Sequence, residues 1–233
     1  MTRYCVWVSG QPLLRLPLAP AQPGSGAATW GISPDPSVER AQLAPGDHLW
    51  LMSPSLPLWL AEGAATRLRV GRRWSQWRVW IGRRRIRRFL AFFGRDAEWI
   101  PPSAIAPGSS ADVDTLTPGR IDSILSILRN RQLLADEVQA AWRELALDPP
   151  IPSAVELHQL VLAGFITRQA AVGLGIFGRL ECRRCGSTDA VYTTWCERCG
   201  GECPQCLDCL NLGIARGCSA LFSVAPKVEV PGN

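Results

Sequence analysis

Eight of the nine cysteines lie within 37 residues near the end of the sequence, and most of them form pairs separated by two residues. A C-x-x-C spacing lets one tight turn direct two thiolates at a single ion, and Gly186 and Gly200, directly after the first two pairs, provide the backbone freedom that such turns need. Two tetrahedral zinc sites, each with four cysteine ligands, would use all eight thiolates. The predicted ligands are Cys182, Cys185, Cys196, Cys199, Cys203, Cys206, Cys209 and Cys218.

Three other interpretations of the cysteines are weaker. Buried core thiols would not cluster at metal-ligand spacing. An iron–sulfur cluster is suggested by Cys203, Cys206 and Cys209, which follow the start of the bacterial ferredoxin pattern, but the next cysteine is nine residues away and no Cys-Pro follows. A thioredoxin-like redox site lacks a β-α-β pattern around any pair. Because a closed four-cysteine site has no open coordination position, we expect the zinc to be a scaffold and the chain to carry no catalytic motif of its own.

A second candidate site is the stretch from residue 63 to residue 94, which contains ten arginines and no acidic residue. Tryptophans interleave with the arginines and phenylalanines follow them. Cations for phosphates and aromatic faces for bases are the two components of surfaces that bind single-stranded nucleic acid. The alternative is that the aromatic residues are core and the arginines a solvated face enriched by codon bias. The predicted contact residues are Arg72, Arg73, Trp74, Trp77, Arg78, Arg83, Arg84, Arg85, Arg87 and Arg88.

The composition of the chain and the expected order of its strands and helices predict an α+β protein. Hydrophobic residues make up 47% of the 233, enough for a core, and glycine and proline are frequent. We expect a small β-rich domain over residues 1–100, a linker over 101–118, a helical segment over 119–180, a zinc module with two four-cysteine sites over 181–224 and a tail over 225–233. Within the arginine-rich stretch a hairpin is favoured over a helix, although Ile86, Phe89, Leu90 and Phe93 also fit a helical stripe.

Capping residues predict where the helices of the middle segment begin and end. Thr117 with Pro118 begins the first helix, and Ser153 with Glu156 forms a capping box for a later one, which Gly164 ends. Thr167 predicts a further short helix over residues 168–172.

The charge of the chain is unevenly distributed. The first hundred residues hold fourteen arginines against six acidic residues, whereas residues 181–233 have a net charge of −1. Each four-cysteine zinc site would add a formal charge of −2, so the zinc module is a poor surface for DNA phosphates. There is no apolar stretch of about 18 residues, no signal-peptide pattern and no P-loop. We therefore expect a cytoplasmic protein without membrane insertion and without an ATP-binding motor in these residues.

Three segments together resemble a known family. The run from Leu128 to Leu134, the Cys182–Cys185 pair followed by Gly186, and the stretch from Cys206 to Gly213 are similar to the amino-terminal part of the ComFA late competence proteins. Those proteins are superfamily 2 helicase-like ATPases for DNA uptake, and primosomal helicases of the PriA type carry a comparable double zinc module. The resemblance covers about residues 120–222.

The resemblance implies a zinc-stapled region that binds single-stranded DNA beside an ATP-driven translocase used in transformation. It also implies that the pair Cys182 and Cys185 shares its ion with Cys206 and Cys209, which leaves the other four cysteines for a second ion. Spacing alone leaves a sequential pairing open. The alternative function is a zinc-dependent module that docks a ComFC-like, phosphoribosyltransferase-like protein and binds no DNA.

Overall fold

The computed structural model describes residues 5–10, 30–33, 48–53, 55–68, 76–95, 98–100, 116–145, 147, 150–175 and 178–225. The described residues form helices and several small antiparallel sheets, so the predicted α+β class is confirmed. The predicted linker falls mostly on residues 101–115, and nearly all of the predicted tail on 226–233, which lie outside the described residues. Among the described helices, none is long and apolar enough to cross a membrane.

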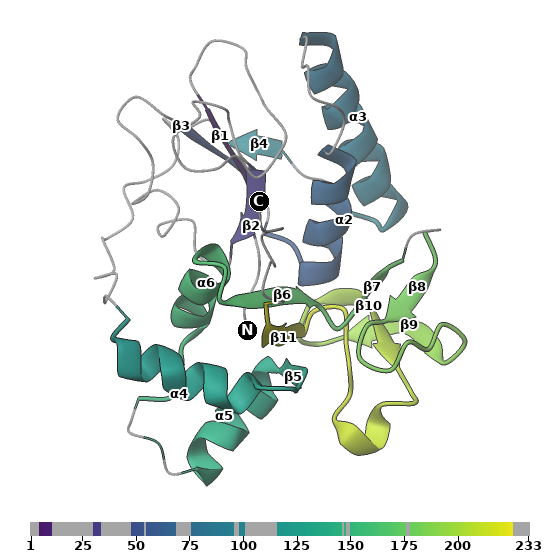
Figure 1. Ribbon diagram of the computed structural model, residues 1–233. Helices are drawn as coiled ribbons and strands as arrows, with labels where there is room; N and C mark the ends of the chain where they lie inside the picture. The colour runs from purple at the N-terminus through teal and green to yellow at the C-terminus, as the bar shows by residue number, and fades with distance from the viewer. Residues whose placement is uncertain are drawn as a thin grey trace, which may run out of the picture.

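The first part of the chain contains a four-stranded antiparallel sheet in the order β2-β1-β3-β4. Its strands are β1 (Cys5–Gly10), β2 (Trp30–Ser33), β3 (His48–Ser53) and β4 (Glu98–Ile100). Two helices, α2 (Leu58–Leu68) and α3 (Gln76–Phe92), lie between β3 and β4 in the sequence and pack side by side at one end of this sheet (Figure 1).

The hairpin predicted for the arginine-rich stretch is wrong, because Gln76–Phe92 is one helix. Ile86, Phe89 and Leu90 are buried at helical spacing, while the arginines between them are exposed. Burial of this apolar stripe against α2 outweighs the modest cost of Gly82 inside a helix.

In the described residues, the predicted helical segment contains three helices, but strands occupy its later part. It contains α4 (Pro118–Leu128), a short strand β5 (Leu133–Leu134), α5 (Ala135–Glu144) and α6 (Ala154–Leu162). Pro118 begins α4 directly after Thr117. The capping box of α6 is confirmed, since the Ser153 hydroxyl accepts from the Glu156 amide at 3.1 Å and the Glu156 carboxylate accepts from the Ser153 amide at 2.7 Å.

The short helix predicted after Thr167 is wrong, because Ile166–Ala170 is the strand β6. It pairs antiparallel with β11 (Ala220–Val224), which in turn pairs with β5. The three-stranded sheet β5-β11-β6 therefore joins the helical segment to the chain that leaves the cysteine cluster.

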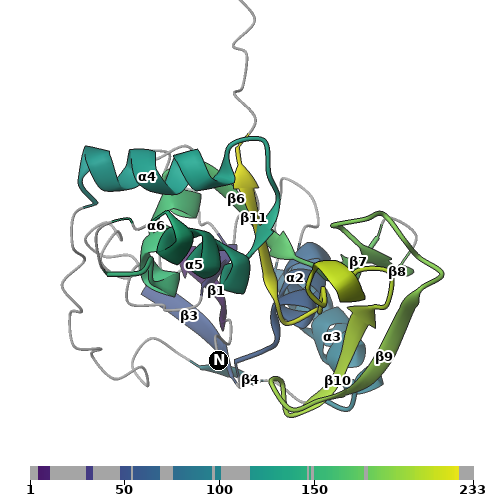
Figure 2. The same cartoon turned by 90° about the horizontal axis from the view of Figure 1, so that it is seen from below.

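The cysteine-rich part consists of two small antiparallel pairs and a 3-10 turn. The pairs are β7 (Val172–Leu174) with β8 (Leu180–Cys182), and β9 (Val191–Cys196) with β10 (Gly201–Cys206), followed by η2 (Leu210–Leu212). In both Figure 1 and Figure 2 these strands lie on one side of β6 and β11, and α4, α5 and α6 lie on the other.

Helix α2 connects the first part of the chain to the cysteine-rich part. The Trp59 amide donates to the Gly217 carbonyl at 3.0 Å, and a Cβ at Gly217 would lie 2.6 Å from the Trp59 ring. The Glu62 carboxylate accepts from the Ala170 amide at 2.7 Å and from the Arg183 guanidinium at 2.5 Å. The described parts of the first hundred residues are thus packed against the rest, and the predicted domain boundaries stay a prediction.

Candidate metal centres

The eight cysteines gather in two groups of four. The first group, here called site A, consists of Cys182, Cys185, Cys206 and Cys209, and the second, site B, consists of Cys196, Cys199, Cys203 and Cys218. Within each group the sulfur atoms all lie within 4.8 Å of one another. The first cysteine pair thus shares its site with the fourth pair and not with the second, and we call this the crossed arrangement. It is the pairing that the family resemblance implies. The ferredoxin-like run is divided between the two sites, because Cys203 belongs to B while Cys206 and Cys209 belong to A.

The sulfur positions fit a tetrahedral ion. A zinc–sulfur bond of about 2.3 Å places the sulfur atoms of a regular tetrahedron about 3.8 Å apart. The Sγ–Sγ distances are 3.7 Å for Cys182 with Cys209, 3.6 Å for Cys185 with Cys206, and 3.9 Å for Cys196 with Cys218. A disulfide would require about 2.05 Å. Each group could therefore hold one metal ion, and the all-sulfur ligand set is the one that structural zinc sites use.

Tight turns at the ends of short strands hold each site. Cys182 ends β8 and Cys196 ends β9, and each is followed by a turn in which a glycine amide donates back to the cysteine carbonyl, at 2.7 Å for Gly186 and 2.9 Å for Gly200. These glycines have φ values of 77° and 62°, in the left-handed region that favours glycine. The role predicted for both glycines is confirmed.

The two sites are sealed by different apolar clusters. Cys196, Cys199 and Cys203 of site B belong to the large core that includes Trp59 and Leu90. Three cysteines of site A belong to a smaller cluster with Ala171, Val172 and Leu221, while Cys185 is exposed. Most of the cysteines in both groups are thus buried, which suits a structural role.

The thiols of each group compete for ionisation. In site B, hydrogen bonds from Cys199 and Cys218 lower the pKa of Cys203 to about 4, and the hydrogen bond to Cys203 raises the pKa of Cys199. In site A, burial raises the pKa of Cys206 to about 11. Burial also acts to raise the pKa of Cys185, but hydrogen bonds from the Ser187 backbone and the neighbouring thiols outweigh it and lower that pKa. Four adjacent thiolates need a nearby cation, so metal binding at either site would release protons.

The arginines inside the cysteine turns are tied to acidic residues of the surrounding helices. Arg183 bonds to Glu62 of α2, and Arg184 lies 2.8 Å from Glu137 of α5. Arg198 lies 3.1 Å from Asp136 of α5, and this bond is the largest of the effects that raise the pKa of Arg198. These cations fix the turns to the helices.

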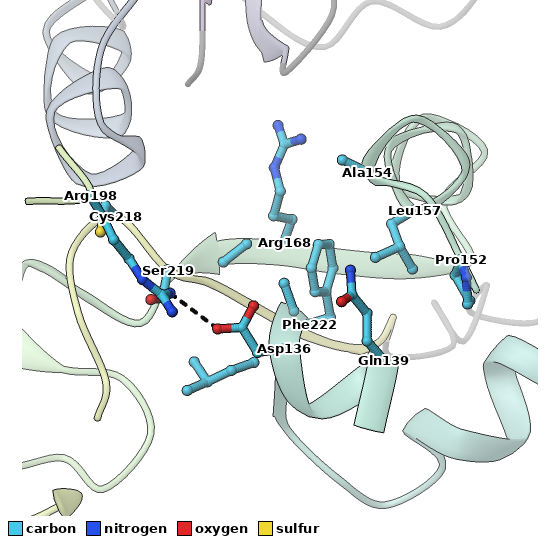
Figure 3. Close-up of a pocket in the computed structure, with 13 residues that line it drawn as sticks. Asp136, Gln139, Pro152, Ala154, Leu157, Arg168, Arg198, Cys218, Ser219 and Phe222 are labelled. Carbon is cyan, nitrogen blue, oxygen red and sulfur yellow. Dashed lines mark hydrogen bonds and ion pairs between the residues drawn. The ribbon is translucent and has the colours of Figure 1, made fainter. Parts of the chain in front are cut away.

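A cavity of about 440 Å³ lies where site B meets the helices. Figure 3 shows that Arg198 and Asp136 face each other beside Cys218, with Phe222 and Leu157 along the wall formed by β11 and α6. Arg168 also lines the cavity, and it bonds to the ring of the buried His158 at 2.9 Å. Of the described residues that line this cavity, Cys218 is the cysteine that belongs to site B.

Those residues predicted to contact nucleic acid that the structure describes belong to α3 and to neither metal group. Four of them, Arg84, Arg85, Arg87 and Arg88, are exposed along α3. Arg72, Arg73 and Trp74 lie outside the described residues. Trp77, Arg78 and Arg83 belong to α3, but their side chains are outside the described part.

The structure adds aromatic and cationic residues that the predicted site omits. Phe92 is 83% exposed at the end of α3, and Arg67 of α2 lies with its guanidinium 3.7 Å from the centre of the Phe89 ring. Together with Arg85 and Arg88 they line one cavity. The sequence contains these residues in its acid-free stretch, but only the packing of α2 on α3 brings them together.

Comparison with known protein families identifies the part of the chain that contains the metal groups. Residues 119–223 match the family model described as the Competence protein ComFA N-terminal domain. This stretch runs from α4 to β11 and contains all eight clustered cysteines, so the part of the chain with the metal groups is similar to ComFA N-terminal domains. No curated protein and no solved structure gave a match to the chain.

Proposed function

We propose that this protein binds single-stranded DNA through α3 and uses two zinc ions at sites A and B as a scaffold. The process that it serves is DNA uptake in transformation, as part of a ComFA-like ATP-dependent translocase that works in the cytoplasm. The ComFA N-terminal domain at residues 119–223 supports this context. Because these 233 residues contain no P-loop, the ATP-driven motor would come from elsewhere in the translocase.

The observation that carries the proposal is the charge of α3. The helix has no acidic residue, and Arg84, Arg85, Arg87 and Arg88 are exposed beside an inner face that is buried. Clustered exposed cations bind phosphates and release their counterions, which supplies affinity without sequence preference. The arginines of the first two cysteine turns are paired with Glu62, Glu137 and Asp136, so the metal-site turns offer little additional positive charge to a strand.

The metal sites contribute by fixing the position of α3. Helix α3 packs on α2, and α2 is bonded to the site A turn through Glu62 and Arg183 and to the chain beside Cys218 through Trp59 and Gly217. Removal of the metal from either site would loosen these anchors. The zinc ions therefore support DNA binding without contacting DNA.

Fluorescence anisotropy with a labelled thymidine 20-mer tests the proposal. Four phosphate contacts predict that log K falls with log salt at a slope of about −2.8, which is a loss of affinity of about 50-fold between 50 and 200 mM salt. The double variant Arg84→Glu with Arg87→Glu should weaken binding strongly and reduce the slope by about 1.4.

A matched control separates the position of the charges from the net charge. Arg129 and Arg143 are also exposed, at the ends of α4 and α5, so Arg129→Glu with Arg143→Glu makes the same charge change elsewhere. This control should bind nearly as the unaltered protein does. Equal binding by both double variants, or no binding of single-stranded DNA by the unaltered protein, would exclude α3 as the contact surface.

A second candidate function is the docking of a ComFC-like protein without DNA binding. The observation that favours it is a group of exposed apolar side chains on the cysteine-rich part. Leu207, Leu210 and Leu212 are exposed around Cys209, and Trp195 of β9 is 72% exposed. Exposed apolar patches of this kind mark protein–protein contacts.

A pull-down with the ComFC-like protein distinguishes the two functions. Docking through the apolar group predicts a complex that survives nuclease and is lost in Leu210→Ser with Leu212→Ser. If that complex forms while the protein leaves single-stranded DNA unbound, the second function replaces the first.

A further inference from the structure

A cavity of about 420 Å³ lies beside α3, and it combines cations with aromatic rings. It is lined by residues of α2 and α3 and by Leu174 and Gly178 of the ComFA N-terminal domain, and none of the described residues that line it is acidic. We call this cavity the notch. Its cationic and aromatic lining residues include Arg67, Arg85, Arg88, Phe89 and Phe92.

A chain of ring contacts holds Phe92 in place although it is exposed. Trp59 in the core contacts Phe93 edge to face with ring centres 4.8 Å apart, and Phe93 contacts Phe92 in the same way at 5.0 Å. An edge-to-face contact occupies one side of a ring and leaves a face open. Exposure of 83% therefore presents a fixed aromatic surface to the solvent.

Close helix packing forms the floor of the notch. A Cβ at Gly63 of α2 would lie 2.5 Å from the Phe89 ring and 3.3 Å from Leu174, so only glycine lets that ring lie against α2. The Gly63 carbonyl accepts from Arg67 at 2.8 Å, which holds the guanidinium over Phe89. Burial lowers the pKa of Arg67 from its ordinary value, as expected for a cation withdrawn from water.

Helix geometry separates the arginines of α3 into two sets. Arg85, Arg88 and Phe92 recur at intervals of three and four, so they share one flank of the helix and all three line the notch. Because successive residues are 100° apart around a helix, Arg84 and Arg87 lie on a different face of α3, and neither of them lines the notch. The notch thus offers three guanidiniums beside one open ring.

We infer that the notch is a subsite for one nucleotide of a single strand, in which Phe92 stacks on the base and Arg85, Arg88 and Arg67 bind the flanking phosphates. This inference rests on the proposed function, since it names the place on α3 where a base is held. Stacking on an aromatic ring suits any base, so the subsite adds affinity with little sequence preference. Leu174 and Gly178 make the subsite a joint product of the α2–α3 pair and the ComFA N-terminal domain.

The test measures the affinity of zinc-loaded protein for two labelled strands, a thymidine 10-mer and an abasic backbone of the same length. Phe92→Ala should weaken binding of the thymidine strand about 5- to 150-fold and change binding of the abasic strand less than twofold. Phe92→Tyr, which keeps the ring, should bind as the unaltered protein does. Arg88→Ala should weaken binding more than Arg87→Ala, its neighbour outside the notch. Circular dichroism and zinc content confirm that each variant is folded.

The outcomes separate this inference from the proposed function. If the unaltered protein binds no single-stranded DNA, the proposed function and the notch both fail. If it binds but Phe92→Ala has no effect, or weakens both strands equally, the notch is overturned while α3 remains the contact surface. Thymidine monophosphate should not compete with the strand at micromolar concentration. Competition at that level would assign the notch to a free nucleotide and overturn its role in holding a strand.

Discussion

Glu62 is the residue whose replacement most directly tests the attachment of α2 to the metal-site turns. Its carboxylate accepts from the amide of the buried Ala170 at 2.7 Å and from Arg183 at 2.5 Å, and the side chain is only 16% exposed. Glu62→Ala would leave a buried amide without this acceptor, at a cost of about 1–3 kcal/mol, and would remove a charge-assisted hydrogen bond. We expect the free energy of unfolding to fall by about 2–4 kcal/mol in total. This is less than the sum of the two largest values, because some water can reach the site and replace part of the lost hydrogen bonding.

Urea unfolding of zinc-loaded protein at constant free zinc measures this loss. A change of this size corresponds to a fall in melting temperature of about 4–16 °C for a chain of this length. Glu62→Gln keeps an acceptor for Ala170 and should cost about half as much. The control is Glu144→Ala, an exposed change on α5 that should stay within about 0.5 kcal/mol. If Glu62→Ala also stays within that range, α2 is not held by this carboxylate, and the account of how α3 is positioned is wrong.

Two further predictions concern single contacts. Gly217→Ala places a Cβ 2.6 Å from the Trp59 ring and should lower the free energy of unfolding by about 1–3 kcal/mol. The control Gly119→Ala has open space around its Cβ and should leave the free energy of unfolding unchanged or raise it. Equal midpoints of urea unfolding for the two variants would contradict the close packing at Gly217. Burial acts to raise the pKa of Glu156, but the hydrogen bonds from Arg120 and Ser153 and the positive charge of Arg120 together outweigh it and lower that pKa. These interactions therefore stabilise the fold above the ordinary glutamate pKa, and the stabilisation is lost as the pH falls through the lowered value. Glu156→Gln should therefore cost about 1 kcal/mol at pH 7 and progressively less below about pH 4, and a cost that does not change with pH would contradict the ion pair.

Local chemistry in the sequence predicted the pairs of cysteines that could share an ion and the capping box of α6. Two cysteines in one tight turn must face the same ion, and the capping box of Ser153 with Glu156 needs no partner outside its own turn. Which turns meet is a different question, because it depends on how β8, β9 and β10 are arranged. The spacing therefore left both pairings open, and the structure shows the crossed one.

Elements whose type depends on distant partners were predicted less well. Residues 166–170 form a strand because β11, more than 50 residues later, pairs with them. In the arginine-rich stretch a hairpin was preferred although the apolar residues also fitted a helix, and the burial of Ile86, Phe89 and Leu90 against α2 decides for the helix. The notch could not be predicted, since it exists only where α2, α3 and β7 come together.

The central claim is that two ions are held in the crossed arrangement, and native mass spectrometry of paired cysteine variants tests it most directly. The unaltered protein should carry two zinc ions. Cys182→Ser with Cys209→Ser removes two ligands from site A alone and should leave one ion, whereas Cys182→Ser with Cys196→Ser damages both sites and should leave none. The reverse result would show the sequential pairing, and a folded unaltered protein that binds no metal would contradict the account altogether.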